Sequence, residues 1–500
     1  MNYTSTRDNT VRVDSATAIA RGISPDGGLY VPVEIPQYDY SALCDTVKAD
    51  YRERAVDILR RFLTDYSLDE LRECVYAAYT DKFGSDDEVA PVVSINDNRY
   101  VLELWHGPTS AFKDMALQLL PHLLTRAVKK TGSDKETVIL VATSGDTGKA
   151  ALEGFADVPG TRIIVFYPED GVSNIQKLQM TTQRGGNVNV CAVRGNFDDA
   201  QTGVKRIFTD PTLIGELNAH GMAFSSANSI NWGRLVPQIV YYINSYLELM
   251  EVGEMDYKNE PFNIVVPTGN FGNILAAYYA KLMGLPVKKL ICASNANNVL
   301  TDFLRTGVYD RNRAFHTTIS PSMDILISSN LERLLFHMSG GDSAQVKNWM
   351  YQLNNTGRYE VGPEMTARIR DTFWAGYCDD NGTKSEIKAM FESDGYLCDT
   401  HTAVGLNVYK QYVEATGDST TPTIIASTAS PFKFAPSVLG ALSEIDPMRS
   451  EFDIIDELSV ISGCAVPPAL AELDNMPVRF TGVCERGAMA QVVRDMLFKG

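Results

Sequence analysis

A chain of 500 residues is too long for one small hydrophobic core, so we expect two or three domains. Its composition, with 44% hydrophobic and 21% charged residues, is that of a globular protein with a substantial interior. The formal net charge of -17 at pH 7 argues against nucleic-acid and anionic-membrane partners, because like charges repel. A negatively charged substrate would therefore need a pocket that is locally basic or lined with backbone amides.

The sequence predicts a cytoplasmic protein without a metal site. The first residues lack the basic segment and apolar run of a signal peptide, and no apolar run reaches the roughly 18–20 residues of a membrane span. The cysteines and histidines are scattered, without a CxxC, HxH or HExxH spacing. This pattern is typical of reduced intracellular thiols rather than of a disulfide framework or a zinc site.

Residues 1–95 form the first predicted unit, an N-terminal domain. The segment SPDGGLYVP, residues 24–32, indicates a glycine-rich turn that leads into a short strand. Apolar residues at helical spacing predict two amphipathic helices, over residues 51–66 and 68–83. A strand over residues 100–104 then begins the next unit.

A single lysine, Lys113, stands at a predicted junction between a turn and a helix. The residues before it favour a turn, and apolar residues recur at helical spacing from Met115 to Ala127. At the positive end of a helix dipole, and partly removed from water, its amine would have a lowered pKa and would act as a nucleophile. Taken alone, a solvated lysine in the first turn of a surface helix explains the pattern better.

From about residue 96 onward a repeating unit indicates an α/β fold. In each unit a short apolar run rich in branched residues is followed by a polar loop and then by a helical pattern. The predicted strands cover residues 137–142, 162–167, 262–266, 289–293 and 423–426. Strands that alternate with helices form parallel sheets, which bind ligands at the carboxyl ends of their strands.

We divide this part of the chain into two open α/β domains. The smaller covers residues 96–235 and the larger covers residues 236–500. Residues from about 340 to 395 are more polar and are predicted to be a helical insertion in the larger domain. A last helix is expected over residues 486–498.

Two loops with anion-binding character follow predicted strands. Residues 143–148 (TSGDTG) and 269–273 (GNFGN) each precede a helix, where glycine turns and free backbone N–H groups bind anions. The first resembles a nucleotide P-loop but lacks its first glycine and its final Ser or Thr, and a tight strand–helix turn is the alternative. The second suits a single phosphate monoester.

A third polar loop, residues 226–234, places hydroxyl and amide groups before Arg234. This combination suits a second phosphate or a carboxylate, because a guanidinium group binds such anions with two hydrogen bonds. The alternative is a helix N-cap at Asn228 or Ser229, with Arg234 in solvent.

Several segments in this order together resemble the threonine synthases of the longer bacterial and fungal type. They are HGPTSAFKDMALQ, ATSGDTG, SSANSINWGRLVPQ, PTGNFGNILAAYYAK and SPSMDILISSNLERLLF, and SPDGGLYVP is similar to the N-terminal segment of that family. The resemblance covers most of residues 20–440. It implies a fold-type-II pyridoxal 5'-phosphate enzyme, similar to tryptophan synthase β. Its reaction would convert O-phospho-L-homoserine and water to L-threonine and phosphate by γ-elimination and β-addition, the last step of threonine biosynthesis.

The resemblance also implies roles at single positions. Lys113 would form the Schiff base with the cofactor and then move protons at the substrate Cα and beyond. Thr428 would be the partner of the cofactor's ring nitrogen. The loop that binds the cofactor phosphate would consist of Gly269, Asn270, Phe271, Gly272 and Asn273. The groups that hold the substrate phosphate and carboxylate would be Thr143, Ser144, Thr147, Asn228, Ser229 and Arg234.

The chain departs from the family pattern in one segment and carries an unusual residue in another. After Ser427-Thr428-Ala429 the family usually reads His-Pro-Ala-Lys-Phe, whereas this chain reads Ser430-Pro431-Phe432-Lys433-Phe434. A role for a histidine there is therefore in doubt. Asp146 stands where many fold-type-II relatives carry Asn against the cofactor's 3'-oxygen. A carboxylate in that contact needs a proton or a cationic neighbour.

Two other functions are weighed against this one. Another fold-type-II lyase, such as a serine/threonine dehydratase or a β-replacing synthase, acts on substrates without a phosphate, which the basic segment 228–234 would not suit. A catalytically silent, threonine-synthase-like binding protein would lack Lys113 or the cofactor-phosphate loop, and both are present. We expect a monomer, with a homodimer as the alternative.

Overall fold

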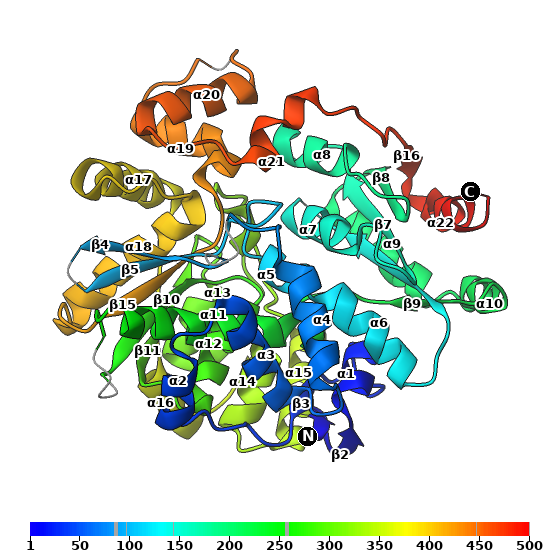
Figure 1. The fold of residues 1–500 in the computed structure, drawn as a ribbon, viewed down its shortest axis with the longest axis horizontal. Coiled ribbons are helices and arrows are strands. Elements are labelled where there is room, and N and C mark those ends of the chain that lie inside the picture. Colours follow the sequence, from blue (N-terminus) through cyan, green and yellow to red (C-terminus); the bar gives the residue numbers. More distant parts are fainter. Residues whose placement is uncertain (85–88, 97, 144, 256–259, 447, 500) are drawn as a thin grey trace.

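The computed structural model describes residues 1–84, 89–96, 98–143, 145–255, 260–446 and 448–499. Two sheets dominate it, with the larger on the left and the smaller on the right of Figure 1. The six-stranded sheet has the order β14–β11–β10–β15–β5–β4 and is parallel except at β4. The five-stranded sheet, in the order β16–β8–β7–β6–β9, is parallel throughout. The α/β fold with parallel sheets is confirmed.

Most of the strands occur where apolar, branched residues cluster. Those of the larger sheet are β4 (Val92–Asn96), β5 (Arg99–Glu103), β10 (Phe262–Pro267), β11 (Val287–Ser294), β14 (Phe373–Tyr377) and β15 (Thr423–Ser427). Those of the smaller are β6 (Glu136–Ala142), β7 (Thr161–Pro168), β8 (Val188–Arg194), β9 (Met222–Ser225) and β16 (Val483–Glu485). The central strands β10 and β15 are buried at every residue, as expected for parallel strands covered on both faces.

Helices cover both sheets. Around the smaller sheet lie α6 (Leu120–Lys130), α7 (Asp146–Phe155), α8 (Asn174–Thr181), α9 (Phe197–Phe208), α10 (Pro211–Ala219) and α22 (Met489–Phe498). Around the larger lie α11 (Trp232–Glu251), α12 (Gly272–Met283), α13 (Val299–Thr306), α16 (Pro363–Thr372), α17 (Asp380–Asp394), α18 (Thr400–Thr416) and α19 (Ala435–Leu442). Further elements are β12 (Val308–Asp310), α14 (Leu331–Met338), α15 (Ser343–Thr356), β13 (Arg358–Glu360), α20 (Glu451–Ser462) and α21 (Pro468–Ala471).

The N-terminal residues form a small antiparallel sheet and helices that pack beneath both sheets (Figure 1). The sheet contains β1 (Tyr3–Ser5), β2 (Asp8–Val13) and β3 (Tyr30–Pro32), and the helices are α1 (Ser15–Arg21), α2 (Tyr40–Thr46), α3 (Tyr51–Phe62) and α4 (Leu68–Tyr79). At their contact with the rest of the chain, the Trp232 ring of α11 is fully buried and packs edge-on against Tyr3 and Tyr279. Aromatic packing of this kind joins the N-terminal unit to the core.

Neither sheet is built from one continuous stretch of sequence. Strand β5, in the predicted domain 96–235, pairs with β15 in the larger sheet, and β16, near the end of the chain, pairs with β8 in the smaller one. The hydrogen-bonded sheets therefore do not follow the predicted domain limits at residues 95 and 235. Those limits remain a prediction about which parts of the chain fold as units.

The predicted helical insertion at about 340–395 contains two strands besides its helices. One of them, β14, is the edge of the larger sheet and pairs in parallel with β11. Its five residues, FWAGY, are too few for their periodicity to distinguish a strand from a helix. The segment is therefore mainly helical, as predicted, but it also supplies an edge strand that its sequence did not indicate.

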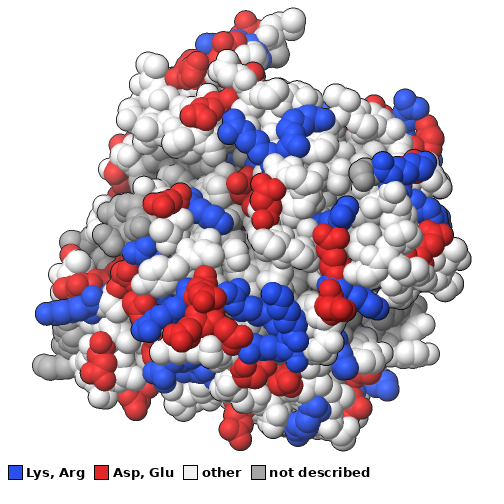
Figure 2. Space-filling model, turned by 45° about the vertical axis from the view of Figure 1, so that its right-hand side comes forward, with Lys and Arg blue, Asp and Glu red and all other residues white. Residues whose placement is uncertain are grey.

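Acidic and basic side chains lie interspersed over the face of the molecule shown in Figure 2. On that face the negative charge is thus spread out rather than gathered in one region. Within the described ranges, no helix combines the length and the apolar character needed to cross a bilayer.

Candidate active site

Lys113 lies at an almost fully buried position. It follows β5 and directly precedes α5 (Asp114–Leu117), a helix of only four residues. We expected one helix from Lys113 onward, but α6 starts separately at Leu120. The cause is Pro121 in its first turn, because proline lacks an N–H and restricts the residue before it. Such a short helix has little dipole, so burial is the larger influence on the lysine.

The Lys113 amine is held by two oxygen atoms. Its side chain is 10% exposed, and Nζ lies 3.3 Å from Asp146 Oδ2 and donates to Ser322 Oγ at 3.1 Å. Burial, together with repulsion from Lys433 and Arg234, lowers the pKa of Lys113, while Asp146 acts in the opposite direction. The amine therefore loses its proton more readily than an ordinary lysine, as a nucleophile requires.

Asp146, the first residue of α7, binds a second lysine through its other oxygen. Oδ1 lies 3.0 Å from Lys433 Nζ and accepts a hydrogen bond from Gln176 Nε2 at 2.9 Å. Burial alone would raise the pKa of the Asp146 carboxyl, but the Lys433 and Lys113 ammonium groups hold it well below its usual range. The cationic neighbours that a carboxylate needs at this position are therefore present.

The glycine loop of residues 269–273 follows β10 and begins α12. Phe271 adopts a left-handed conformation, with φ 64°, at the helix N-cap. A Cβ atom on Gly269 would lie 2.7 Å from the Ser322 carbonyl oxygen, so only glycine fits this approach. The first N–H groups of α12 have no partner within the helix, which makes this turn suited to an anion. Asn273 Oδ1 accepts from the hydroxyls of Tyr241 and Tyr242, at 2.6 Å each.

The third loop places a buried arginine at the start of α11. The N-cap of this helix is Asn231, not Asn228 or Ser229, and its side chain accepts from the Gly233 N–H. Arg234 is 7% exposed, and its Nη1 donates to the Ala227 carbonyl at 2.9 Å. Burial lowers the pKa of Arg234 to about 10. The alternative of a solvated Arg234 with a cap at Asn228 or Ser229 is therefore wrong.

The glycine loop and the third loop are joined by Asn330. Its Nδ2 group donates to the backbone oxygens of Ser229 and of Asn270, at 3.2 Å each. Close by, the Ser229 hydroxyl lies 3.1 Å from Ser329 Oγ. Asn228 and Asn270 are exposed, whereas Ser229 is half-buried. The structure thus brings two predicted anion-binding loops side by side.

The TSGDTG loop is arranged around the Thr143 hydroxyl. This oxygen accepts from the backbone N–H groups of Gly145 and Gly148, at 3.0 Å each. The hydroxyl therefore holds the turn, and direct contact with a substrate stays a prediction. Thr147 is half-buried in the first turn of α7. Ser144 lies outside the described residues.

Thr428 lies beside the Lys113 loop, directly after β15. Its backbone oxygen accepts from the Phe112 N–H at 2.9 Å, one residue before Lys113.

The site also contains a histidine that sequence reasoning missed. His401 Nε2 accepts from the Ser322 N–H at 3.2 Å, while Nδ1 lies 2.7 Å from Asp399. The protein thus has a histidine near Lys113 although Ser430 replaces the usual one.

Sequence reasoning also missed several other residues that contact the site: Gln176, Ser322, Asn330 and Lys433. Ser322 and Asn330 belong to the segment SPSMDILISSNLERLLF, which carries the family resemblance. The polar run before the helix in that segment was the sequence signal that could have identified them.

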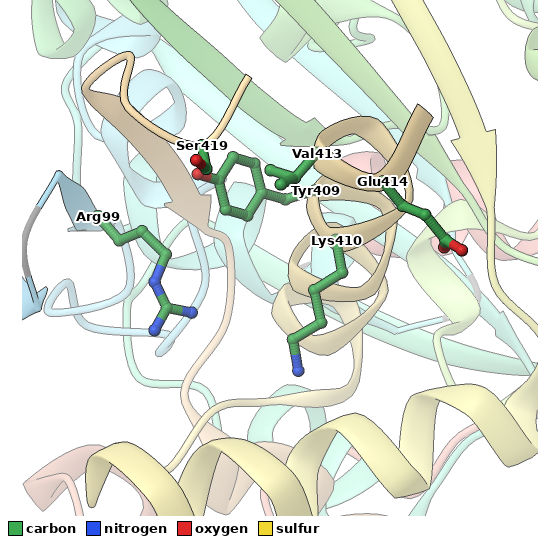
Figure 3. A pocket seen from close by; sticks show the side chains of 6 residues that line it. All are labelled: Arg99, Tyr409, Lys410, Val413, Glu414 and Ser419. Carbon is green, nitrogen blue, oxygen red and sulfur yellow. The ribbon is translucent and has the colours of Figure 1, made fainter. Parts of the chain in front are cut away.

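A hollow of about 400 Å³, lined by Arg99, Tyr409, Lys410, Val413, Glu414 and Ser419, lies farther along α18 than His401 (Figure 3). Across the described residues, no group of three His, Cys, Asp or Glu side chains could hold a metal ion.

Three family models match the chain. They are the threonine synthase N terminus over residues 2–79, the pyridoxal-phosphate dependent enzyme over residues 94–369, and the threonine synthase C-terminal model over residues 402–495. The matches extend over most of the chain. They agree with the resemblance found in the sequence motifs.

Curated relatives fall into two groups. The human protein "Threonine synthase-like 1" is 41% identical over 85% of this chain, which spans 57% of that relative's length. The threonine synthase of Pseudomonas aeruginosa is 37% identical, covering 88% of this chain and 90% of its own. That of Saccharomyces cerevisiae is 36% identical, covering 91% and 92%.

A solved structure from Brucella melitensis extends the likeness to the whole fold. This threonine synthase, described as bound to PLP, superposes with a TM-score of 0.88 at 35% identity and covers 99% of both chains. The predicted fold-type-II architecture is confirmed. The chain belongs to the threonine synthase family of pyridoxal-phosphate-dependent enzymes.

Proposed function

We propose that this chain converts O-phospho-L-homoserine and water to L-threonine and phosphate with pyridoxal 5'-phosphate as cofactor. One observation carries the proposal: the buried Lys113 amine, with its lowered pKa, lies among loops that offer two separate anion sites. One is the start of α12 and the other is Arg234. The cofactor and the substrate each carry a phosphate, so the reaction requires two such sites.

The residues present fit the cofactor. Lys113 is the proposed point of covalent attachment, and residues 269–273 are proposed to hold the phosphate at the N-terminus of α12, where the backbone approaches Ser322 too closely for any side chain on Gly269. Thr428 is the proposed partner of the ring nitrogen. Asp146 is proposed to lie near the 3'-oxygen, where the Lys433 ammonium group supplies the cationic neighbour that a carboxylate needs.

When bound, the cofactor supplies an electron sink for charge that develops at the substrate Cα and Cβ. The chain's own part is to hold the substrate and to move protons. Lys113 is proposed to remove and return protons, since its amine is already poised to lose one. The substrate phosphate and carboxylate are proposed to bind Arg234 with the neighbouring polar groups, namely Thr143, Ser144, Thr147, Asn228 and Ser229.

The buried charge of Arg234 favours this reaction over that of a dehydratase or a β-replacing synthase. No salt bridge reaches it from the part of the chain that the structure describes, and its pKa is depressed by burial. A buried cation without a counter-ion is costly, and an anionic substrate would remove that cost.

We further propose that the enzyme is a cytoplasmic monomer. All eight cysteines are free thiols, including the exposed Cys464, as a reducing compartment allows.

Absorbance spectroscopy combined with a phosphate assay tests this function. The protein with pyridoxal 5'-phosphate should show a band near about 410 nm, and O-phospho-L-homoserine should yield phosphate and threonine. Lys113→Ala should lose the band and the activity, whereas Lys129→Ala, an exposed lysine on α6, should keep both. Absence of the band in the unmodified protein would exclude the cofactor. A band without phosphate release would point to another lyase.

A further inference from the structure

The Asp146 carboxylate is shared between two lysines that come from distant parts of the chain. Lys113 Nζ approaches Oδ2 at 3.3 Å, and Lys433 Nζ approaches Oδ1 at 3.0 Å. Lys433 is completely buried in a short 3₁₀ helix, Pro431–Phe434, after β15. Its Nζ also donates to the Thr109 carbonyl at 2.8 Å, in the loop that carries Lys113. Lys433 is therefore fixed on both sides and cannot turn toward water.

We propose that Lys433 is a positioning residue that shares the Asp146 carboxylate with Lys113, weakens the hold of Asp146 on the Lys113 ammonium group, and so releases the neutral amine for reaction. The inference deepens the proposed function and rests on it for the reaction that this amine performs. Without Lys433, the full charge of a buried carboxylate would act on Lys113 alone. A buried ion pair of that kind would hold the lysine protonated.

The other groups around the cluster agree with this arrangement. The charged residues that act on Lys113 are Asp146 of α7, Lys433 and Arg234 of α11. Asp114 of α5 also interacts electrostatically with Lys433, and its carboxyl accepts hydrogen bonds from the Thr109 N–H and hydroxyl. Ser322 supplies only a neutral hydroxyl, 3.1 Å from both Lys113 Nζ and Asp146 Oδ2. At Lys113 itself one carboxylate, Asp146, is thus opposed by two other cations, Lys433 and Arg234, which favours loss of a proton from its ammonium group.

The test measures how readily Lys113 is acetylated as a function of pH. Trace labelling of the full chain, freed of any bound cofactor, with acetic anhydride and read by mass spectrometry reports the neutral Lys113 amine. Lys129 is exposed and serves as the internal standard. The variants are Lys433→Met, Asp146→Asn, the double variant and Lys433→Arg. Circular dichroism establishes that each one is folded.

The two single variants should shift the labelling midpoint in opposite directions. Lys433→Met should raise it by about one pH unit, because a repelling charge is lost and Asp146 is left to Lys113 alone. Asp146→Asn should lower it, because the attracting charge is lost. The double variant should return toward the unmodified protein, and Lys433→Arg, which keeps the charge, should stay close to it. A purely structural role for Lys433 would not produce opposite shifts that cancel.

An unchanged or lowered midpoint in folded Lys433→Met would overturn the inference. If that variant does not fold, a midpoint in Asp146→Asn that fails to fall would overturn it equally. Failure of the proposed function has a different signature, namely the absence of a cofactor band in the unmodified protein. The labelling midpoints could still shift as expected in that case, so the two results are distinguishable.

Discussion

Arg234 is a charged residue at a buried position, where removal of the charge from water costs free energy. It is buried at the start of α11, and its guanidinium donates a hydrogen bond to the Ala227 backbone carbonyl rather than to a carboxylate. A buried cation is usually stabilised by a hydrogen-bonded or oppositely charged group that offsets the loss of hydration. In an enzyme that binds a phosphorylated amino acid, the substrate itself can do so, and the interaction would then contribute strongly to binding.

Replacing Arg234 with Ala should therefore raise KM for O-phospho-L-homoserine by about tenfold to a hundredfold, the range expected when a hydrogen bond to a charged group is lost. The cofactor band should persist, because Lys113 is untouched. Steady-state kinetics and absorbance measure the two effects. Arg206→Ala, an exposed arginine on α9, is the matched control and should change neither. An unchanged KM in Arg234→Ala would place the substrate phosphate elsewhere.

Among the elements, the contact between α5 and α7 decides how Lys113 meets Asp146. Lys113 directly precedes α5, and Asp146 is the first residue of α7. The two helices approach so closely at Gly154 that a Cβ atom there would lie 2.0 Å from the Leu117 carbonyl oxygen. Glycine is required here for space rather than for an unusual backbone conformation.

Gly154→Ala should push α5 away from α7 and lower the free energy of unfolding by about 1–3 kcal/mol, the usual cost of overpacking a core. The affinity for pyridoxal 5'-phosphate should fall as well, because the Lys113–Asp146 contact depends on the same packing. Urea denaturation and a cofactor titration measure these effects. In Gly215→Ala, on α10, the new Cβ meets nothing within 4 Å, so this control should be neutral or stabilising by up to about 1 kcal/mol. Equal behaviour of the two variants would contradict the packing argument.

At the scale of the whole molecule, the end of the chain completes a domain that begins far earlier in the sequence. After α20 and α21 it crosses from the region of the larger sheet to the smaller one, as the red segment in Figure 1 shows. There β16 pairs with β8, and α22 packs against α9. Three apolar side chains of α22, Met489, Val493 and Leu497, are buried in the core of the smaller sheet.

Val493→Ala should destabilise the protein by about 2 kcal/mol, because the side chain is fully buried and its removal leaves a cavity. If the terminal helix belongs to the same folding unit as β6–β8, the unfolding transition should stay single and move to a lower temperature. Calorimetry measures both. Val492→Ala, at a half-buried neighbouring position, should cost less. A separate early transition in Val493→Ala would mean that the C-terminal segment unfolds on its own.

The sequence by itself determined several central strands of both sheets and the polar loops that follow them, and it singled out Lys113 as a candidate. Periodicity and glycine placement are local properties, so residues 137–142 and 262–266 could be recognised as strands without knowledge of their partners. Motifs in a fixed order then indicated the family. In the glycine loop 269–273, Gly269 fits the close approach to Ser322, whereas the left-handed position of the turn falls on Phe271, which its residue type did not indicate.

Only the tertiary structure decided which groups surround these residues. Lys433 pairs with Asp146 although nearly three hundred positions separate them in the chain, and neither residue type indicates the other. The burial of Arg234, the edge strand β14 and the return of β16 to the smaller sheet depend likewise on distant segments. Electrostatic and packing energies are set by distance in space and by exclusion of water, and a pattern of neighbours along the chain contains neither.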